Sequence, residues 1–209
     1  MFLRRLEIHN CRSIRHAEID FTVETAGQAR KWSILVGENG TGKSTVLKAA
    51  ALLLSGSDAL PFLLGEPRTW VRDGQKSCRI EADIQTEKGD IRKIALDIPA
   101  DASLRQVLSD NSANLERLDA ALEHAQQNYF LVGYGPHRYA GREGPSFGSR
   151  SRSHSDAGSH RVESVRTLFD RSASINPLEN WAMTLDYKRG AVGLDTVREA
   201  LDALLPGVE

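Results

Sequence analysis

The sequence predicts an α/β fold in which a buried strand leads through a glycine-rich loop directly into a helix. Residues 32–36 form a nearly continuous apolar run, which is typical of a strand buried on both faces. The glycine-rich loop follows, and from Lys43 the apolar residues recur with a helical period that Gly56 ends. Two pairs of alternating segments, within residues 1–22 and 78–98, add antiparallel hairpins to what we expect to be a mixed sheet.

Length and composition indicate a globular protein. The chain has 209 residues, of which 40% are hydrophobic and 26% charged, enough to bury a sizeable core. Lys and Arg number 27 against 28 Asp and Glu, so the net charge of −1 gives no overall attraction to nucleic acid. The longest apolar run, residues 49–54, is far shorter than the roughly 20 residues that span a bilayer. Two separated cysteines, Cys11 and Cys78, fit a reducing compartment, so we expect a cytoplasmic protein with no membrane partner.

The patterns divide the chain into three regions. Residues 1–140 form one lobe, with a helical segment at about 101–127 inserted before a second apolar strand at 129–134. Residues 141–162 are rich in Gly, Ser and Arg, which predicts a flexible loop. Residues 163–209 return to a helical pattern.

The glycine-rich loop carries the strongest functional signal. Residues 37–44 read Gly-Glu-Asn-Gly-Thr-Gly-Lys-Ser and fit G-x-x-x-x-G-K-[ST] at every fixed position. Such a loop turns backbone N–H groups toward phosphate oxygens, and the helix after it points its positive end at the same anion. We expect Lys43 to bind the β- and γ-phosphates of ATP and the Ser44 hydroxyl to ligate Mg²⁺. The candidate binding residues of the loop are Gly37, Glu38, Asn39, Gly40, Thr41, Gly42, Lys43, Ser44 and Thr45.

The loop and the hairpin before it resemble a particular group of ATPases. Residues 8–14 read Ile-His-Asn-Cys-Arg-Ser-Ile, and a second strand to Phe21 precedes the loop. This order is similar to the N-terminal part of ABC-type P-loop ATPases of the RecF, SMC and OLD group, which act in chromosome maintenance, DNA repair and phage defence. The resemblance covers residues 1–55 and, in outline, 129–209, where it is similar to the smaller OLD-like, defence-associated AAA-type ATPases. It implies the N-terminal lobe of an ABC-ATPase-like P-loop NTPase fold.

The resemblance also implies roles for three residues outside the loop. Arg12 and Ser13 occupy positions that reach the bound nucleotide from beside the loop, although Arg12 in a solvated turn needs no such role. His137 stands where these ATPases carry a Gln directed at the metal and the attacking water. The resemblance further implies a homodimer formed through the ATP site, with DNA or a partner nuclease as a further partner.

Two motifs of an ABC-type site are not recognisable. The acidic Walker B motif has its nearest match at Asp97, but Ile98 follows instead of Glu, and the segment fits a hairpin strand. The signature motif is mimicked by residues 54–56 at the end of the loop helix and by 108–110 within helical sequence. We therefore expect the chain to bind ATP with little turnover of its own, and the resemblance places the remaining lobe after residue 209.

Other interpretations stay open at the level of sequence. A self-contained small P-loop kinase or NTPase would use the arginine-containing segment 142–161 as a lid, and an interaction module with an idle loop would bind no nucleotide. The arginines of residues 138–161 provide a local positive charge for nucleic-acid phosphate, although a solvated basic loop is the simpler interpretation. None of the six histidines shows the spacing of metal ligands, so histidine metal sites are not expected.

Overall fold

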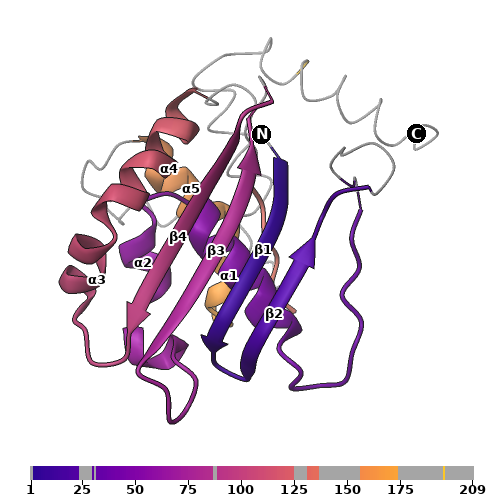
Figure 1. Cartoon of the computed structure of the whole chain (residues 1–209). Helices are drawn as coiled ribbons and strands as arrows, with labels where there is room; N and C mark the ends of the chain where they lie inside the picture. Colours follow the sequence, from indigo (N-terminus) through magenta and orange to yellow (C-terminus); the bar gives the residue numbers. More distant parts are fainter. Residues whose placement is uncertain are drawn as a thin grey trace.

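The computed structural model describes residues 2–23, 30, 32–86, 89–124, 131–136, 156–173 and 195. These residues form four strands, five α-helices and one 3₁₀ helix (Figure 1). In chain order they are β1 (Phe2–Cys11), β2 (Ile14–Asp20), α1 (Lys43–Leu54), α2 (Leu60–Leu64), η1 (Pro67–Trp70), β3 (Ser77–Gln85), β4 (Ile91–Pro99), α3 (Leu104–Asp110), α4 (Ser112–His124) and α5 (Asp156–Phe169).

The strands form one antiparallel sheet in the order β2-β1-β3-β4. Both predicted hairpins are confirmed: β1 pairs with β2 across a turn at Arg12 and Ser13, and β3 pairs with β4. The two hairpins join through β1 and β3, where Ile8 lies opposite Ile80. Alternation along each strand turns the apolar side chains to one face and the charged side chains to the other.

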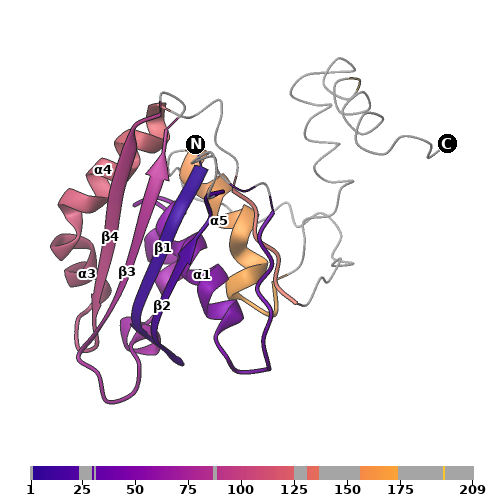
Figure 2. The ribbon, with the colours of Figure 1, turned by 45° about the vertical axis from the view of Figure 1, so that its right-hand side comes forward.

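Helices cover the apolar face of the sheet. Helix α1 lies across this face, with α5 beside it on the side away from the sheet (Figures 1 and 2). The predicted helical insertion is confirmed as α3 and α4, which pack along β4 and contribute Val107, Leu115 and Leu118 to the core. Its last residues, 125–127, lie outside the described part of the chain. A membrane-spanning helix would need a long apolar stretch, and none of the helices in these residues provides one.

The apolar run before the glycine-rich loop is not the buried strand that the sequence predicts. Residues 32–36 are assigned no strand, and the side chains of Trp32, Ile34 and Val36 are 88%, 85% and 90% exposed. A buried strand needs hydrogen-bonding neighbours on both sides. No described strand lies beside this run, so the parallel part of the expected mixed sheet is not formed by the described residues, although the α/β class itself is confirmed.

The second apolar run also differs from its prediction. Of residues 129–134, the described 131–134 form no strand; they lie along α5, where the Gly133 amide donates to the Ser164 carbonyl at 3.0 Å. A Cβ on Gly135 would lie 2.1 Å from the Thr167 carbonyl oxygen, so this close approach requires glycine.

The predicted Gly/Ser/Arg loop extends less far than expected. Helix α5 begins at Asp156, so residues 156–162 are helical, because Val165 and Leu168 anchor this helix in the core. Residues 141–155, the rest of the predicted loop, lie outside the described residues, as do 174–194 and 196–209 of the predicted C-terminal helical segment.

Asn111, at the junction of α3 and α4, links the helical insertion to the edge strand β4 through hydrogen bonds. Its side chain is 1% exposed and donates to the carbonyls of Asp97 and Val107, each at 2.7 Å. Its amide oxygen accepts from the Asp97 N–H at 2.8 Å. Asn111 thus satisfies backbone groups of the edge strand β4 that have no strand neighbour in the described sheet.

We predict that Asn111→Ala lowers the free energy of unfolding by about 1–3 kcal/mol, because it leaves buried backbone groups without partners. Urea denaturation followed by circular dichroism measures this loss. Glu116→Ala, at an exposed position of α4, is the matched control and should change stability by less than about 0.5 kcal/mol. Equal stability of the two variants would contradict the role given to Asn111.

Candidate phosphate-binding site

The glycine-rich loop turns directly into α1. Gly40 and Gly42 have φ values of 85° and 101°, a left-handed conformation that favours glycine. Gly42 is the N-cap of α1, and its carbonyl accepts the first helical hydrogen bond from the Val46 N–H at 2.9 Å. The helix dipole and the first N–H groups of α1 are therefore directed at the loop.

Lys43 lies across the loop. Its Nζ donates to the carbonyl oxygens of Gly37 at 2.6 Å and Glu38 at 2.5 Å. The Thr41 hydroxyl donates to the same Glu38 carbonyl at 2.9 Å. The ammonium group therefore lies within the loop, where it could contact an anion bound there.

The loop contains a cavity of about 220 Å³ with a polar lining. The lining residues are Ser13, Asn39, Gly40, Gly42, Lys43, Ser44 and Thr45. The structure thus brings together most of the residues that the sequence selects, including Ser13 from the β1–β2 turn. Their binding of nucleotide stays a prediction. His137 lies outside the described residues.

The β1–β2 turn packs directly against the loop. A Cβ placed on Gly42 would lie 2.7 Å from Cγ1 of Ile14 and 3.2 Å from Oγ of Ser13. Ile14 is itself buried. Gly42 is therefore required for two reasons, its positive φ and the absence of space for a side chain.

A short segment after η1 holds this turn from its other side. The Arg12 N–H donates to the Trp70 carbonyl at 2.9 Å, and the Arg72 N–H donates to the Asn10 carbonyl at 2.8 Å. Asn10 and Arg12 both have a φ of 50°, which is uncommon for residues other than glycine. The backbone hydrogen bonds on both sides stabilise this unusual turn geometry.

The Arg12 side chain is directed at Trp70 and not into the cavity. Its guanidinium carbon lies 4.3 Å from the centroid of the Trp70 ring, and Nε donates to the Thr69 carbonyl at 3.2 Å. This arrangement is a cation–π contact. The role of Arg12 in reaching a bound nucleotide stays a prediction. The sequence offered no signal for the Trp70 contact, because the two residues are far apart along the chain.

Lys48 on α1 lies near the positive charges of Arg12 and Arg171. Burial, together with the nearby charges of Arg12 and Arg171, lowers the pKa of Lys48. Nζ of Lys48 lies 5.9 Å from the centroid of the Phe169 ring, and Phe169 in turn lies against Trp70. Lys48 therefore belongs to the packing between α1 and α5, and it does not line the loop cavity.

The three segments that partly match the Walker B and signature motifs lie in a strand, at the end of a helix and within a helix, outside the loop cavity. Asp97 lies in β4 and its carboxylate pairs with Arg79. Ser55 is fully buried at the end of α1, where its hydroxyl donates to the Ala51 carbonyl at 2.6 Å. Residues 108–110 lie in α3. No carboxylate lines the loop cavity within the described part of the chain.

The loop, its glycine N-cap and its lysine identify the chain as a protein of the P-loop class. The chain belongs to the family of the AAA ATPase domain, whose model matches residues 1–129. That match includes both hairpins, the loop and the helical insertion.

Two relatives agree with this assignment. Septu protein PtuA from Bacillus mycoides (strain KBAB4) is 47% identical over 57 residues, covering 27% of this chain and 8% of the relative. DNA replication and repair protein RecF from Picosynechococcus sp. (strain ATCC 27264 / PCC 7002 / PR-6) is 31% identical over 91 residues, covering 44% of this chain and 21% of the relative. The chain thus spans less than a quarter of the length of either relative.

We predict that Gly42→Ala destabilises the chain more than Gly40→Ala. Both substitutions place a side chain at positive φ, at a cost of about 1–2 kcal/mol. Only Gly42→Ala also collides with Ile14, which adds about 1–3 kcal/mol, since nothing lies within 4 Å of a Cβ on Gly40. Urea denaturation of the two variants measures the difference.

The double variant Gly42→Ala/Ile14→Ala tests whether the collision is the cause. Removing the Ile14 side chain should make the Gly42→Ala change less costly by about 0.5–3 kcal/mol, as a double-mutant cycle measures. Additive effects would contradict direct packing of the turn on the loop.

Proposed function

We propose that this chain is the ATP-binding part of an ABC-type ATPase of the RecF, SMC and OLD-like group. The observation that carries the proposal is the position of Lys43, whose ammonium group lies against the carbonyls of Gly37 and Glu38 inside the loop. A triphosphate in the loop would replace those carbonyls as the partner of the ammonium group. Its β- and γ-phosphates would also receive hydrogen bonds from loop N–H groups.

The residues present fit ATP together with Mg²⁺. The cavity is lined by hydroxyl, amide and ammonium groups, and the Ser44 hydroxyl at the start of α1 would supply a magnesium ligand. Mg²⁺ would neutralise phosphate charge, and Lys43, Ser44 and the N-terminus of α1 would orient the phosphates. Ser13, on the β1–β2 turn, would contact the nucleotide from the side.

Binding without efficient turnover is the expected behaviour of this chain. Hydrolysis needs a carboxylate to orient or activate water and a further metal ligand. The described lining of the cavity offers no carboxylate. In the intact ATPase, we propose that a second lobe and a second copy of the protein complete the site, so that ATP binding brings the two copies together and hydrolysis separates them.

The output of this cycle is proposed from the two relatives and from the family resemblance. The RecF relative is named for DNA replication and repair. Over its matched region, the PtuA relative is more similar in sequence to this chain than the RecF relative is. The resemblance to OLD-like ATPases favours a role in anti-phage defence. We propose that ATP-driven association signals to DNA or to a partner nuclease in one of these settings.

We predict that Lys43→Ala lowers the affinity of the 209-residue chain for Mg-ATP by about 100-fold, because it removes a charged hydrogen-bond donor to the phosphates. Isothermal titration calorimetry measures the affinity. Lys48→Ala is the matched control, since it removes a lysine from the same helix but not from the cavity. Equal affinities of the Lys43→Ala variant and the parent chain would contradict the proposal.

A measurement of ATP turnover distinguishes the ATP-binding part of an ABC-type ATPase from a self-contained kinase. Phosphate release by the parent chain should remain close to that of the Lys43→Ala variant, and small-molecule phosphate acceptors should not increase ATP consumption. Robust turnover that depends on Lys43 would mean that the chain supplies its own catalytic carboxylate, and the kinase or NTPase interpretation would replace the ABC-type one.

A further inference from the structure

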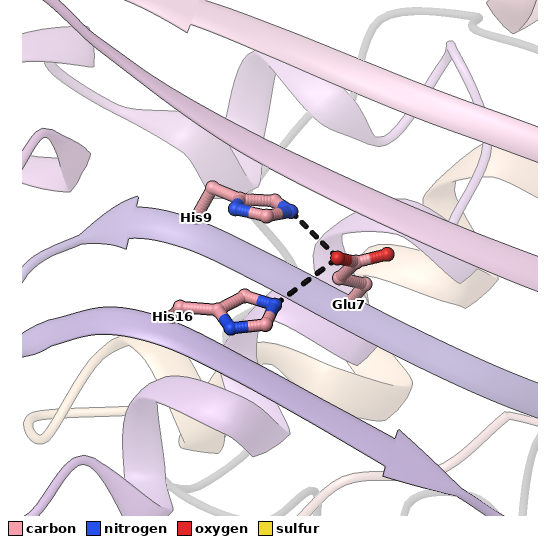
Figure 3. Close-up of side chains that lie close together, drawn as sticks. All are labelled: Glu7, His9 and His16. Carbon is pink, nitrogen blue, oxygen red and sulfur yellow. Dashed lines mark hydrogen bonds and ion pairs between the residues drawn. The ribbon is translucent and has the colours of Figure 1, made fainter.

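Two histidines and a glutamate converge on the charged face of the sheet, opposite the face that α1 covers (Figure 3). Nε2 of His9 lies 2.8 Å from Oε1 of Glu7, and Nε2 of His16 lies 3.1 Å from the same oxygen. The two imidazole rings stack with centroids 4.6 Å apart and planes inclined by 21°. One ligand atom of each residue lies within 4.8 Å of the other two.

The hairpin register creates this cluster. Glu7 and His9 are two residues apart on β1, so their side chains share a face. His16 lies directly opposite His9 on β2. Because the turn at Arg12 and Ser13 fixes this register, the three side chains are brought together by regular β-structure and not by a mobile loop.

Neighbouring charges orient the carboxylate. Arg5 binds the second oxygen of Glu7, Oε2, which leaves Oε1 directed at the two imidazoles. The hydrogen bonds from His16 and His9 to Oε1 and the contact of Arg5 with Oε2 fix the orientation of the Glu7 carboxylate. An arginine that fixes one carboxylate oxygen is the kind of outer interaction that orients a metal ligand.

The surroundings also favour a cation. Arg5 is bound by Glu7 and Glu18, and Arg79 is bound by Glu81 and Asp97. With neutral imidazoles, these two arginines and four carboxylates carry a net charge of −2. A divalent cation on the cluster would neutralise it.

We propose that Glu7, His9 and His16 form a binding site for a divalent transition-metal ion of the Zn²⁺ type. Two imidazole nitrogens and one carboxylate oxygen are ligands that Zn²⁺ accepts, with a fourth position left for water. In its absence each Nε2 donates its hydrogen to the ionised Glu7 oxygen. On metal binding the hydrogen of each neutral imidazole moves to Nδ1, and Nε2 becomes the ligand.

The site would add a cross-link between β1 and β2. His16 is two residues from Ile14, the residue that packs against Gly42 of the loop. The ion would therefore stabilise the hairpin that supports the phosphate-binding loop, without entering the loop cavity. Both cysteines are buried in the core and offer no competing ligand on this face.

The test is a titration of the 209-residue chain, produced without a histidine tag and free of nucleotide, with Zn²⁺ in competition with a chromophoric chelator. The parent chain should bind one ion, and Co²⁺ in its place should give the visible absorption of a tetrahedral site. His16→Gln should weaken Zn²⁺ binding at least about tenfold. The His16 side chain is about half exposed and lies outside the core, so this variant is expected to fold, and circular dichroism checks that it does.

Two controls separate this site from other causes of binding. Glu81→Gln removes one negative charge from the same face but no ligand, and should change the affinity by no more than about threefold. Lys43→Ala should leave Zn²⁺ binding unchanged, which separates the site from the phosphate-binding loop. His9→Gln serves as a second ligand variant. Absence of binding by the parent chain, or equal binding by the parent and both histidine variants, would overturn the proposal.

Discussion

The contact between Ile14 and Gly42 joins the antiparallel sheet to the phosphate-binding loop. Gly42 has no room for a side chain because Ile14 and Ser13 lie against it, and it is also the N-cap of α1. The position of one small residue therefore determines where the loop turns and where the helix begins. Lys43, the next residue, begins α1 and donates to the loop carbonyls of Gly37 and Glu38.

The turn that carries Ile14 is supported from two directions. Backbone hydrogen bonds to Trp70 and Arg72 hold its unusual geometry on one side, and Trp70 is itself buried, with its indole N–H donating to the Leu64 carbonyl at 2.7 Å. On the other side, the paired strands β1 and β2 fix the register. A nucleotide bound in the loop would therefore be coupled through packed side chains to the sheet, and a metal ion on the hairpin would act on the same support.

Much of this arrangement could be predicted from the sequence, and the rest could not for identifiable reasons. Alternating residues predicted both hairpins, and the spacing of Gly37, Lys43 and Ser44 predicted the loop and the start of α1. The run 32–36 has the apolar content of a buried strand, but its side chains are mostly exposed because apolar content alone does not provide a partner strand. Arg12 on Trp70 is a long-range contact that no local pattern encodes. The spacing of Glu7, His9 and His16 along the chain shows no metal-ligand pattern, whereas the pairing of β1 with β2 across a two-residue turn at Arg12 and Ser13 places His9 opposite His16.

Hydrogen–deuterium exchange of the 209-residue chain, with and without Mg-ATP, tests most directly whether the loop is a nucleotide site supported by the hairpin turn. We predict that ATP slows amide exchange in residues 37–46 and also in the β1–β2 turn, residues 10–14, which the nucleotide would reach through Gly42 and Ser13. Lys43→Ala should abolish both effects. Slower exchange confined to regions outside the loop, or unchanged exchange throughout, would contradict the account.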